Sequence, residues 1–220
     1  MPSVKLTYAV IFLLCLLVGC TQSLIAPIED ARTTSDRTED AGNVESTDGS
    51  ESREETIALL TEVPHSAHGF LYTGLQTYPE PWGYSLRYQH HQLSHTHADI
   101  YIYPVPESIN LQSHKRVILE MATQSLQEID FATQQGSYSE YQLLRNSSFE
   151  LEGHFVTRSD LFLVRQNLAV YSMLFLTEKE GRLIKARITV PDNEANRNDP
   201  QWQAFVEEIF TAIIENIHLT

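Results

Sequence analysis

Apolar and polar side chains alternate along "YSLRYQH" (84–90), where polar residues separate Tyr84, Leu86 and Tyr88. A period of two is typical of a strand with one buried face. The stretch "ADIYIYPV" (98–105) is apolar at almost every position. We therefore expect it to form a central strand that is buried on both faces and ends at Pro104.

Strand patterns return in the second half of the chain, at about 139–144, 148–157, 160–166 and 168–178. A turn at Glu180-Gly181 leads into one more apolar stretch, "RLIKARITV" (182–190). Successive strands joined by short turns pair antiparallel. The pattern predicts an antiparallel sheet of about six to eight strands.

The segment of about 113–135 has a helical period instead. Ile118, Ala122, Leu126 and Ile129 recur on one face, and Gly136 is a suitable end. A helix is therefore predicted between the two groups of strands.

A second helix is predicted at about 200–217, with Asp199 as N-cap and Pro200 at its first position. Its polar face carries glutamates and no basic residue, which favours packing in the core over lying on an anionic membrane surface. The apolar stripe consists of Trp202, Phe205, Val206, Ile209, Phe210, Ile213, Ile214 and Ile217.

The order of strands, helix, antiparallel strands and helix predicts an α+β domain in which two helices cover one sheet. This order is similar to that of PsbP- and Mog1-like domains. The resemblance is one of topology without shared motifs, and it implies no functional residues.

The first twenty residues have the form of a secretory signal. Lys5 is the sole charge before Glu29, and residues 8–18 are apolar. As a helix this apolar core would be about 16 Å long, half of the roughly 30 Å hydrocarbon layer. A cleaved signal is therefore favoured over an uncleaved anchor.

The sequence Leu17-Val18-Gly19-Cys20 resembles the lipobox of bacterial lipoproteins. The resemblance covers only this region and implies cleavage before Cys20, lipid attachment to its sulfur and acylation of the new N-terminus. Thr21 in place of an aspartate implies sorting to the outer membrane, facing the periplasm. Several acyl chains together give firm anchoring, at about 0.8 kcal/mol per buried CH₂.

Residues 29–55 contain ten acids, three arginines and one large aliphatic residue, Val44. Such a segment buries too little apolar surface to offset its ordering entropy, so disorder is expected. The predicted organisation is a signal peptide at 1–19, a lipidated cysteine and acidic linker at 20–55, and one α+β domain at 56–220.

Composition excludes some functions. The net charge is −14, with 15 Lys and Arg against 29 Asp and Glu, which argues against nucleic-acid binding. Both cysteines, Cys15 and Cys20, lie in the first twenty residues, so the domain has no disulfide or thiolate site.

Four histidines in "HHQLSHTH", His90, His91, His95 and His97, are candidate metal ligands. An H-x-H pair on a strand places both rings on one face, and imidazole binds Zn²⁺ or Cu²⁺. The spacing matches no specific metal motif. We therefore expect no cofactor and favour a polar hairpin, with Zn²⁺ or Cu²⁺ binding as the alternative.

Two other groups are candidate binding residues. Tyr78, Trp82 and Tyr84 lie on or beside the Pro/Gly loop "TYPEPWGY", where aromatic side chains form either a binding surface or core. Lys185 and Arg187 share a strand face, which fits an anion site or, as we favour, a solvated face.

These features predict a lipid-anchored bacterial envelope protein. Its expected role is a non-enzymatic binding or accessory module for an envelope protein or glycan. The alternative is a periplasmic metal-binding protein that uses the four histidines.

Overall fold

The computed structural model of the chain describes residues 63–79, 83–106, 109 and 113–217. Residue contacts divide the chain into Met1–Ala58 and Leu59–Thr220, and the described residues belong to the second unit. The expected signal peptide, Cys20 and acidic linker lie outside the described residues.

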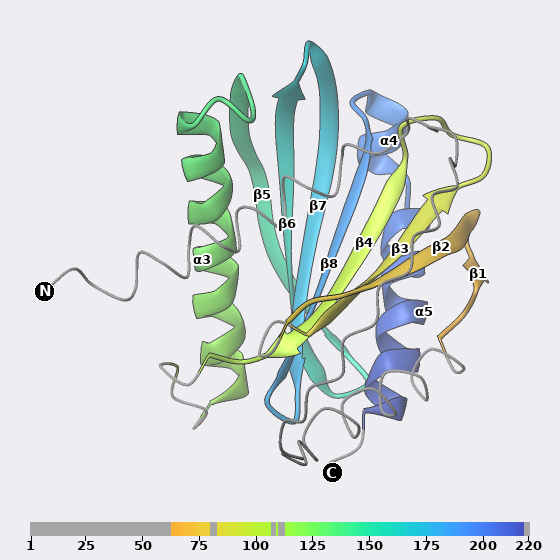
Figure 1. The fold of residues 1–220 in the computed structure, drawn as a ribbon, viewed down its shortest axis with the longest axis vertical. Coiled ribbons are helices and arrows are strands. Elements are labelled where there is room, and N and C mark those ends of the chain that lie inside the picture. The colour runs from red at the N-terminus through yellow and green to blue at the C-terminus, as the bar shows by residue number, and fades with distance from the viewer. Residues whose placement is uncertain (1–62, 80–82, 107–108, 110–112, 218–220) are drawn as a thin grey trace, which may run out of the picture. The chain divides into compact units, whose positions relative to one another are not determined.

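The described unit contains eight strands and three helices (Figure 1). In chain order they are β1 (Ser66–Ala67), β2 (Phe70–Thr77), β3 (Tyr84–His90), β4 (His97–Pro104), α3 (His114–Gln134), β5 (Glu140–Leu151), β6 (His154–Arg165), β7 (Leu168–Lys179), β8 (Arg182–Pro191), α4 (Glu194–Asn198) and α5 (Gln201–Asn216).

All eight strands form one sheet in the order β1-β2-β3-β4-β8-β7-β6-β5, and every neighbouring pair is antiparallel. The groups β1–β4 and β5–β8 each run back and forth in sequence order. The last strand, β8, then pairs with β4 and joins the two groups. The predicted α+β class, antiparallel sheet and two long helices are confirmed.

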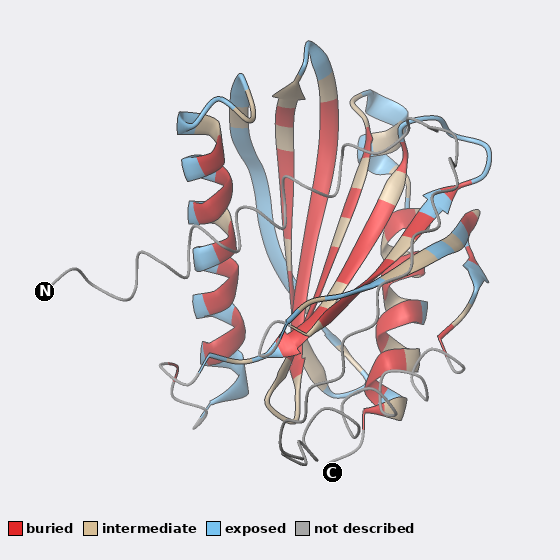
Figure 2. Ribbon diagram, viewed as in Figure 1, coloured by how far each residue is buried: buried red, intermediate tan, exposed pale blue. Residues whose placement is uncertain are grey.

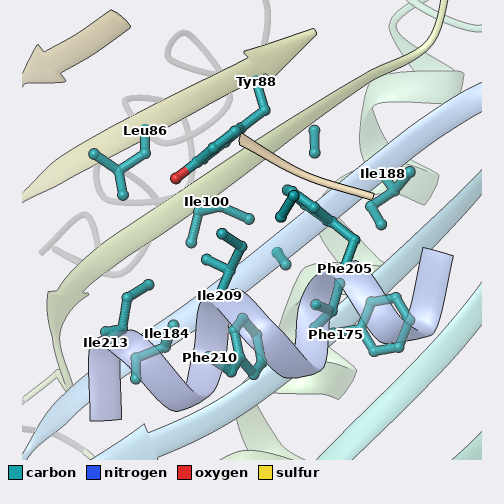
Figure 3. Packing of buried hydrophobic residues seen from close by; sticks show 14 of the residues in the cluster. Leu86, Tyr88, Ile100, Phe175, Ile184, Ile188, Phe205, Ile209, Phe210 and Ile213 are labelled. Carbon is teal, nitrogen blue, oxygen red and sulfur yellow. The ribbon is translucent and has the colours of Figure 1, made fainter. Parts of the chain in front are cut away.

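One face of the sheet forms the main core with α5 (Figure 3). Leu86 and Tyr88 of β3 and Ile100 of β4 pack there with Phe205 and Ile209 of α5, all with no exposed surface. The predicted core role of this helix is confirmed. Among the described residues, no helix is long and apolar enough to cross a bilayer.

The opposite face packs against α3 over only part of its width. Ile129 of α3 lies in a cluster with Leu161 and Leu163 of β6 and Val170 of β7. The sheet contacts of α3 fall mainly on β5, β6 and β7. This helix therefore covers that half of the face. The half formed by β3, β4 and β8 carries mostly polar and charged side chains instead.

The predicted boundaries of β5 and β6 were wrong. The sequence pattern divides this region near Asn146 and again near Arg158, but β5 and β6 are continuous strands of 12 residues each. The turn lies at Glu152-Gly153, where both residues have positive φ (49° and 77°), as in the favoured two-residue hairpins. Figure 2 shows the outer strand, β5, as exposed along most of its length.

Local signals end the helices close to where the sequence predicts. The α3 N-cap is Ser113, whose Oγ accepts from Arg116 N at 3.4 Å, and Gly136 follows its last turn with φ +81°. At α5 the N-cap is Pro200, one residue later than predicted, although Asp199 still accepts from Gln201 N at 3.0 Å.

A buried carboxylate ties β5, β6, β7 and α5 together. Asp160 is 2% exposed and accepts from Nε of Arg145 at 2.6 Å and from Nε of Arg158 at 2.7 Å. Arg158 also donates to Gln203 Oε1 at 3.0 Å and to Tyr171 OH at 3.3 Å. Because the charges are paired and further hydrogen-bonded, the cost of burying them is offset.

We expect Asp160→Asn to lower the free energy of unfolding by about 3 kcal/mol, because it leaves Arg158 without its buried counter-charge. Urea denaturation measures this change. The matched control is Asp192→Asn, whose partner Arg197 has a 40% exposed side chain, so the loss should stay below about 1 kcal/mol. Equal losses in the two variants would contradict the assignment.

Candidate functional site

The four histidines of the β3–β4 connection do not converge. His90 lies at the end of β3 on the α5 side, where its ring contacts the rings of Phe70 and Trp202 at centroid distances of 5.2 and 6.0 Å. His97 begins β4 and is the cross-strand partner of Gln89. Because side chains alternate along β3, Gln89 points to the face opposite that of His90, and His97 shares the face of Gln89. His90 and His97 thus lie on opposite faces of the sheet.

His90 has a structural role in the hairpin. It is 7% exposed, and its Nδ1 accepts from the backbone N–H groups of Gln92 at 3.2 Å and Leu93 at 3.1 Å. A Cβ at Gly69 would lie 2.4 Å from His90 Nε2, and the φ of Gly69 is +83°. Glycine at this position therefore allows the backbone to approach the ring.

The other two histidines of the group also lack a shared centre. His91 stacks on His90 with ring centroids 5.5 Å apart, and its Nδ1 donates to Gly69 O at 2.7 Å. His95 is exposed, with φ +58°. Across the described residues, no group of three or more His, Cys, Asp or Glu side chains could hold a metal ion. The geometry therefore does not favour the metal-binding alternative.

The predicted aromatic surface is not a continuous exposed patch. Tyr84 is 7% exposed and belongs to the α5-side core, which favours the core alternative over a binding surface for this residue. Tyr78 is half-buried, with its hydroxyl 3.1 Å from Ser85 Oγ on the opposite face of the sheet. Trp82 lies outside the described residues.

The expectation that Lys185 lies on a solvated face is wrong. Lys185 is only 3% exposed, and its side chain lies on the α3 side of β8, next to Tyr101 of β4. Its Nζ lies 5.3 Å from the ring centroid of Tyr101 and 5.5 Å from that of Tyr103, within cation–π range. The ammonium group is held against aromatic rings and away from bulk water.

The α3-side surface of β3, β4 and β8 is a set of polar side chains that we call the central polar face. The strand registers place its members in adjacent rows. It consists of Ser85, Arg87, His97, Asp99, Tyr101, Tyr103, Lys185, Arg187 and Thr189.

One row of this face combines two arginines and a carboxylate. Arg87, Asp99 and Arg187 are consecutive cross-strand partners on β3, β4 and β8. Arg87 Nε donates to Asp99 Oδ1 at 2.7 Å, whereas Arg187 donates to hydroxyls, from Nε to Ser172 at 3.0 Å and from Nη2 to Tyr138 at 3.1 Å. The two guanidinium groups therefore have different kinds of partner.

Charge and burial shift the pKa values on this face. Burial lowers the pKa of Lys185 to about 8, and the neighbouring Arg187 lowers it while Glu128 of α3 opposes the shift. Burial also lowers the pKa of His97, with Asp99 opposing. The positive charges of Arg187, Arg87 and Arg165 lower it further, so His97 is neutral at pH 7.

Comparisons with known proteins do not identify the chain. No family model matches it, and no curated protein matches it. Solved structures that match include the cyanobacterial PsbP protein of Synechocystis sp. PCC 6803, with TM-score 0.41, 10% identity and coverage of 69% of this chain and 82% of that chain. A single-residue mutant of Mog1 matches with TM-score 0.39, 11% identity and coverage of 68% and 86%.

A Pseudomonas aeruginosa protein of unknown function, described as a candidate regulator, matches with TM-score 0.36, 13% identity and coverage of 50% and 70%. The order of elements thus has loose counterparts in PsbP and Mog1. At these TM-scores the likeness carries no functional argument.

Sequence reasoning found Lys185 and Arg187 on one strand face but missed the burial and the partners that make this face unusual. The sequence pattern places Asp99 and Tyr101 in the apolar stretch 98–105 and does not distinguish them as site residues. The signal was present in β4 as "ADIYIY", where a charged residue and tyrosines alternate with core positions.

We expect the domain to lose stability as the pH falls below about 6.5. Burial lowers the pKa of His90. The unfolded state therefore takes up the proton first, and protonating Nδ1 removes two hydrogen bonds in the folded state. Urea denaturation at pH 7 and pH 5 should show a smaller decrease for His90→Gln than for the wild type. His95→Gln, which changes an exposed ring, should keep the wild-type decrease.

A second prediction concerns Lys185 at alkaline pH. Because its pKa is about 8 in the folded domain and the ordinary pKa of a lysine is 10.5, the unfolded state binds more protons between these values. Stability should therefore rise with pH from about 8 to 10 through this residue, by at most about 3 kcal/mol.

The difference in unfolding free energy between the wild type and Lys185→Met, measured across this range, isolates the effect of the lysine. Lys115→Met, at an exposed position of α3, is the control and should follow the wild type. A constant difference between the wild type and Lys185→Met would contradict a desolvated ammonium group.

Proposed function

We propose that this chain is a lipid-anchored binding module of a bacterial envelope, attached through Cys20 to the outer membrane and facing the periplasm. The observation that carries this proposal is the position of Cys20, directly after the apolar residues 8–18 and the sequence Leu17-Val18-Gly19. A thiol at the end of an apolar segment is a poor nucleophile, because an apolar setting disfavours the thiolate. Lipid attachment therefore explains the position of Cys20 better than a catalytic role does.

The length between Cys20 and the folded unit supports a tethered arrangement. The domain is expected at 56–220, so 35 residues, 21–55, separate it from the cysteine. A flexible coil of this length averages about 30–35 Å between its ends, and charge repulsion extends it. The domain would therefore reach partners beyond the lipid surface.

The domain acts in this proposal by contact with an envelope protein or glycan, and the central polar face is its contact site. This face combines a desolvated ammonium group, two guanidinium groups and tyrosine rings. Charged and aromatic groups that a rigid sheet holds in place are characteristic of binding surfaces. Arg187 and Tyr101 of this face are half-buried.

Cys20→Ser should abolish lipid labelling and move the protein from the membrane fraction to precursor or soluble material. The reason is that the serine hydroxyl cannot form the thioether that anchors the chain. Metabolic labelling with a fatty acid, cell fractionation and mass spectrometry of the mature N-terminus measure these changes.

Cys15→Ser is the control, because Cys15 lies in the segment that cleavage removes. Its mature product should equal that of the wild type. A mature chain that starts at Met1, or an unmodified Cys20, would refute the anchoring proposal.

A further inference from the structure

The outermost strand of the sheet, β5, has a long edge that no other strand pairs with (Figure 1). It is 12 residues long, pairs with β6 on one side only, and is exposed at nine positions. Among the described residues, no backbone hydrogen bond from a turn or loop reaches it. In an antiparallel strand every second residue directs its N–H and C=O groups to the same side, so about six residues of β5 direct them away from the sheet.

The devices that usually protect an edge strand are few in β5. Natural sheets discourage edge pairing with lysine, proline, bulges or short edge strands. This strand contains neither lysine nor proline. Its register shifts once, between Leu143 and Arg145, and is unbroken from Asn146 to Leu151. The second half of β5 is therefore a regular edge that can accept an added strand.

The opposite edge of the sheet limits which strand this can be. The described part of the chain ends there in β1, which has two residues. So short a strand cannot match the long edge of β5, which disfavours a head-to-tail row of molecules. The β5 strand of a second copy has the required length. Two-fold pairing of identical edges also closes the assembly at two copies, the commonest symmetry of soluble oligomers.

The faces of β5 fix where the two-fold axis of such a pair can lie. Residues opposite each other across the axis must point to the same face of the joined sheet. Since successive side chains alternate between faces, the axis passes beside one residue and not between two. In the middle of the unbroken stretch that residue is Ser147 or Ser148. Small, uncharged side chains therefore meet at the axis in either register.

Charge along β5 is compatible with self-pairing in both registers. Arg145 lies opposite Phe149 or Leu151 of the second copy, according to the register, and Glu150 lies opposite Leu144 or Asn146. No two like charges are opposite each other, an arrangement that would oppose pairing. Arg145 is also held in its own sheet, because its Nε donates to Asp160 Oδ2 at 2.6 Å.

Apolar side chains beside the unbroken stretch add to the gain from pairing. Leu143 and Leu144 are 39% and 37% exposed. In either register they lie near the end of the second copy's β5, so the added strand removes part of their surface from water. Such burial contributes about 25 cal/mol per Å² of apolar surface.

We propose that this chain forms a two-fold dimer in which the β5 edges of two copies pair antiparallel and join the two sheets into one. Both α5 helices then cover the same face of the joined sheet, because an axis perpendicular to the sheet preserves its faces. This inference goes beyond the proposed function and depends neither on lipid attachment nor on the central polar face.

The expected affinity is low. Pairing of two short strand segments buries less than the roughly 1,200–2,000 Å² of a standard protein–protein interface, so dissociation in the micromolar range or above is expected. Attachment of both copies to one membrane, as proposed above, would raise their effective concentration. A weak dimer in solution would then be a populated dimer at the envelope.

The test is sedimentation equilibrium of the mature chain, residues 20–220, carrying Cys20→Ser so that no lipid is attached. We expect a reversible monomer–dimer equilibrium with a dissociation constant between about 10 μM and 1 mM. Amide hydrogen exchange should slow at high concentration for the outward N–H groups of residues 146–151. Exchange in β1 and β2 should not change with concentration.

Lysine at the axis should weaken the dimer. Ser147 and Ser148 are exposed, so Ser147→Lys and Ser148→Lys should leave the urea midpoint of unfolding unchanged. The variant at the axis places two ammonium groups opposite each other and should raise the dissociation constant about fivefold or more. Gln76→Lys, at an exposed position of β2 near the opposite edge, is the matched control and should dimerise as the wild type does.

A mixing experiment identifies the residue at the axis. A mixture of Ser148→Lys with Ser148→Glu, or of the same two variants at Ser147, places opposite charges across the axis. The mixture at the axis residue should restore dimerisation that the Lys variant alone has lost. A strand from a different protein would show no such rescue.

A chain that stays monomeric up to about 1 mM would overturn the inference, because this concentration is the upper limit of the expected dissociation constant. So would a dimer that both Lys variants leave intact, or charge mixtures that restore nothing at either serine. None of these results bears on lipid attachment, which the Cys20 variant tests separately.

Discussion

The alternation of side chains along β4 and β8 is the constraint on which the rest of the domain depends. Because neighbouring residues of a strand point to opposite faces, packing Ile100 and Ile188 against α5 places Asp99 and Arg187 on the α3 side. The α5 side of these two strands is apolar and covered by the helix, but α3 lies mainly over β5, β6 and β7. The strands at the centre of the core therefore carry charge on their other face.

The apolar packing between the sheet and α5 provides stability that offsets the cost of burying charged groups on the other face. Trp202, Phe205 and Phe210 of α5 are almost fully buried, and truncating one such side chain typically costs about 3–5 kcal/mol. Whole domains are stable by only about 5–15 kcal/mol. The desolvation of Lys185 opposes folding, and its cost is a notable fraction of such a total stability. Its presence is compatible with folding because the apolar packing against α5 is extensive, and because Asp160 and its arginines join the outer strands to α5.

The two long helices could be predicted because their signals are local, a 3.6-residue period with end residues at each terminus. The uninterrupted course of β5 up to the turn at Glu152-Gly153 could not be predicted. The "NSS" stretch has a turn-like composition, but its pairing with β6 keeps it in the strand. The separation of His90 from His97 follows from the register of β3 and β4, which a six-residue connection leaves open. The burial of Lys185 depends on long-range packing in the folded domain, and no local pattern encodes it.

The desolvation of Lys185, which is 3% exposed, carries a cost that the proposed binding role of the central polar face would explain. A ligand that binds only the folded domain adds stability in proportion to the logarithm of its concentration over its dissociation constant. In the proposed arrangement, attachment through Cys20 would also confine the domain to a layer whose depth the 35 intervening residues, 21–55, set. In that layer a partner fixed to the envelope would be present at high effective concentration, so that a modest affinity would suffice for binding.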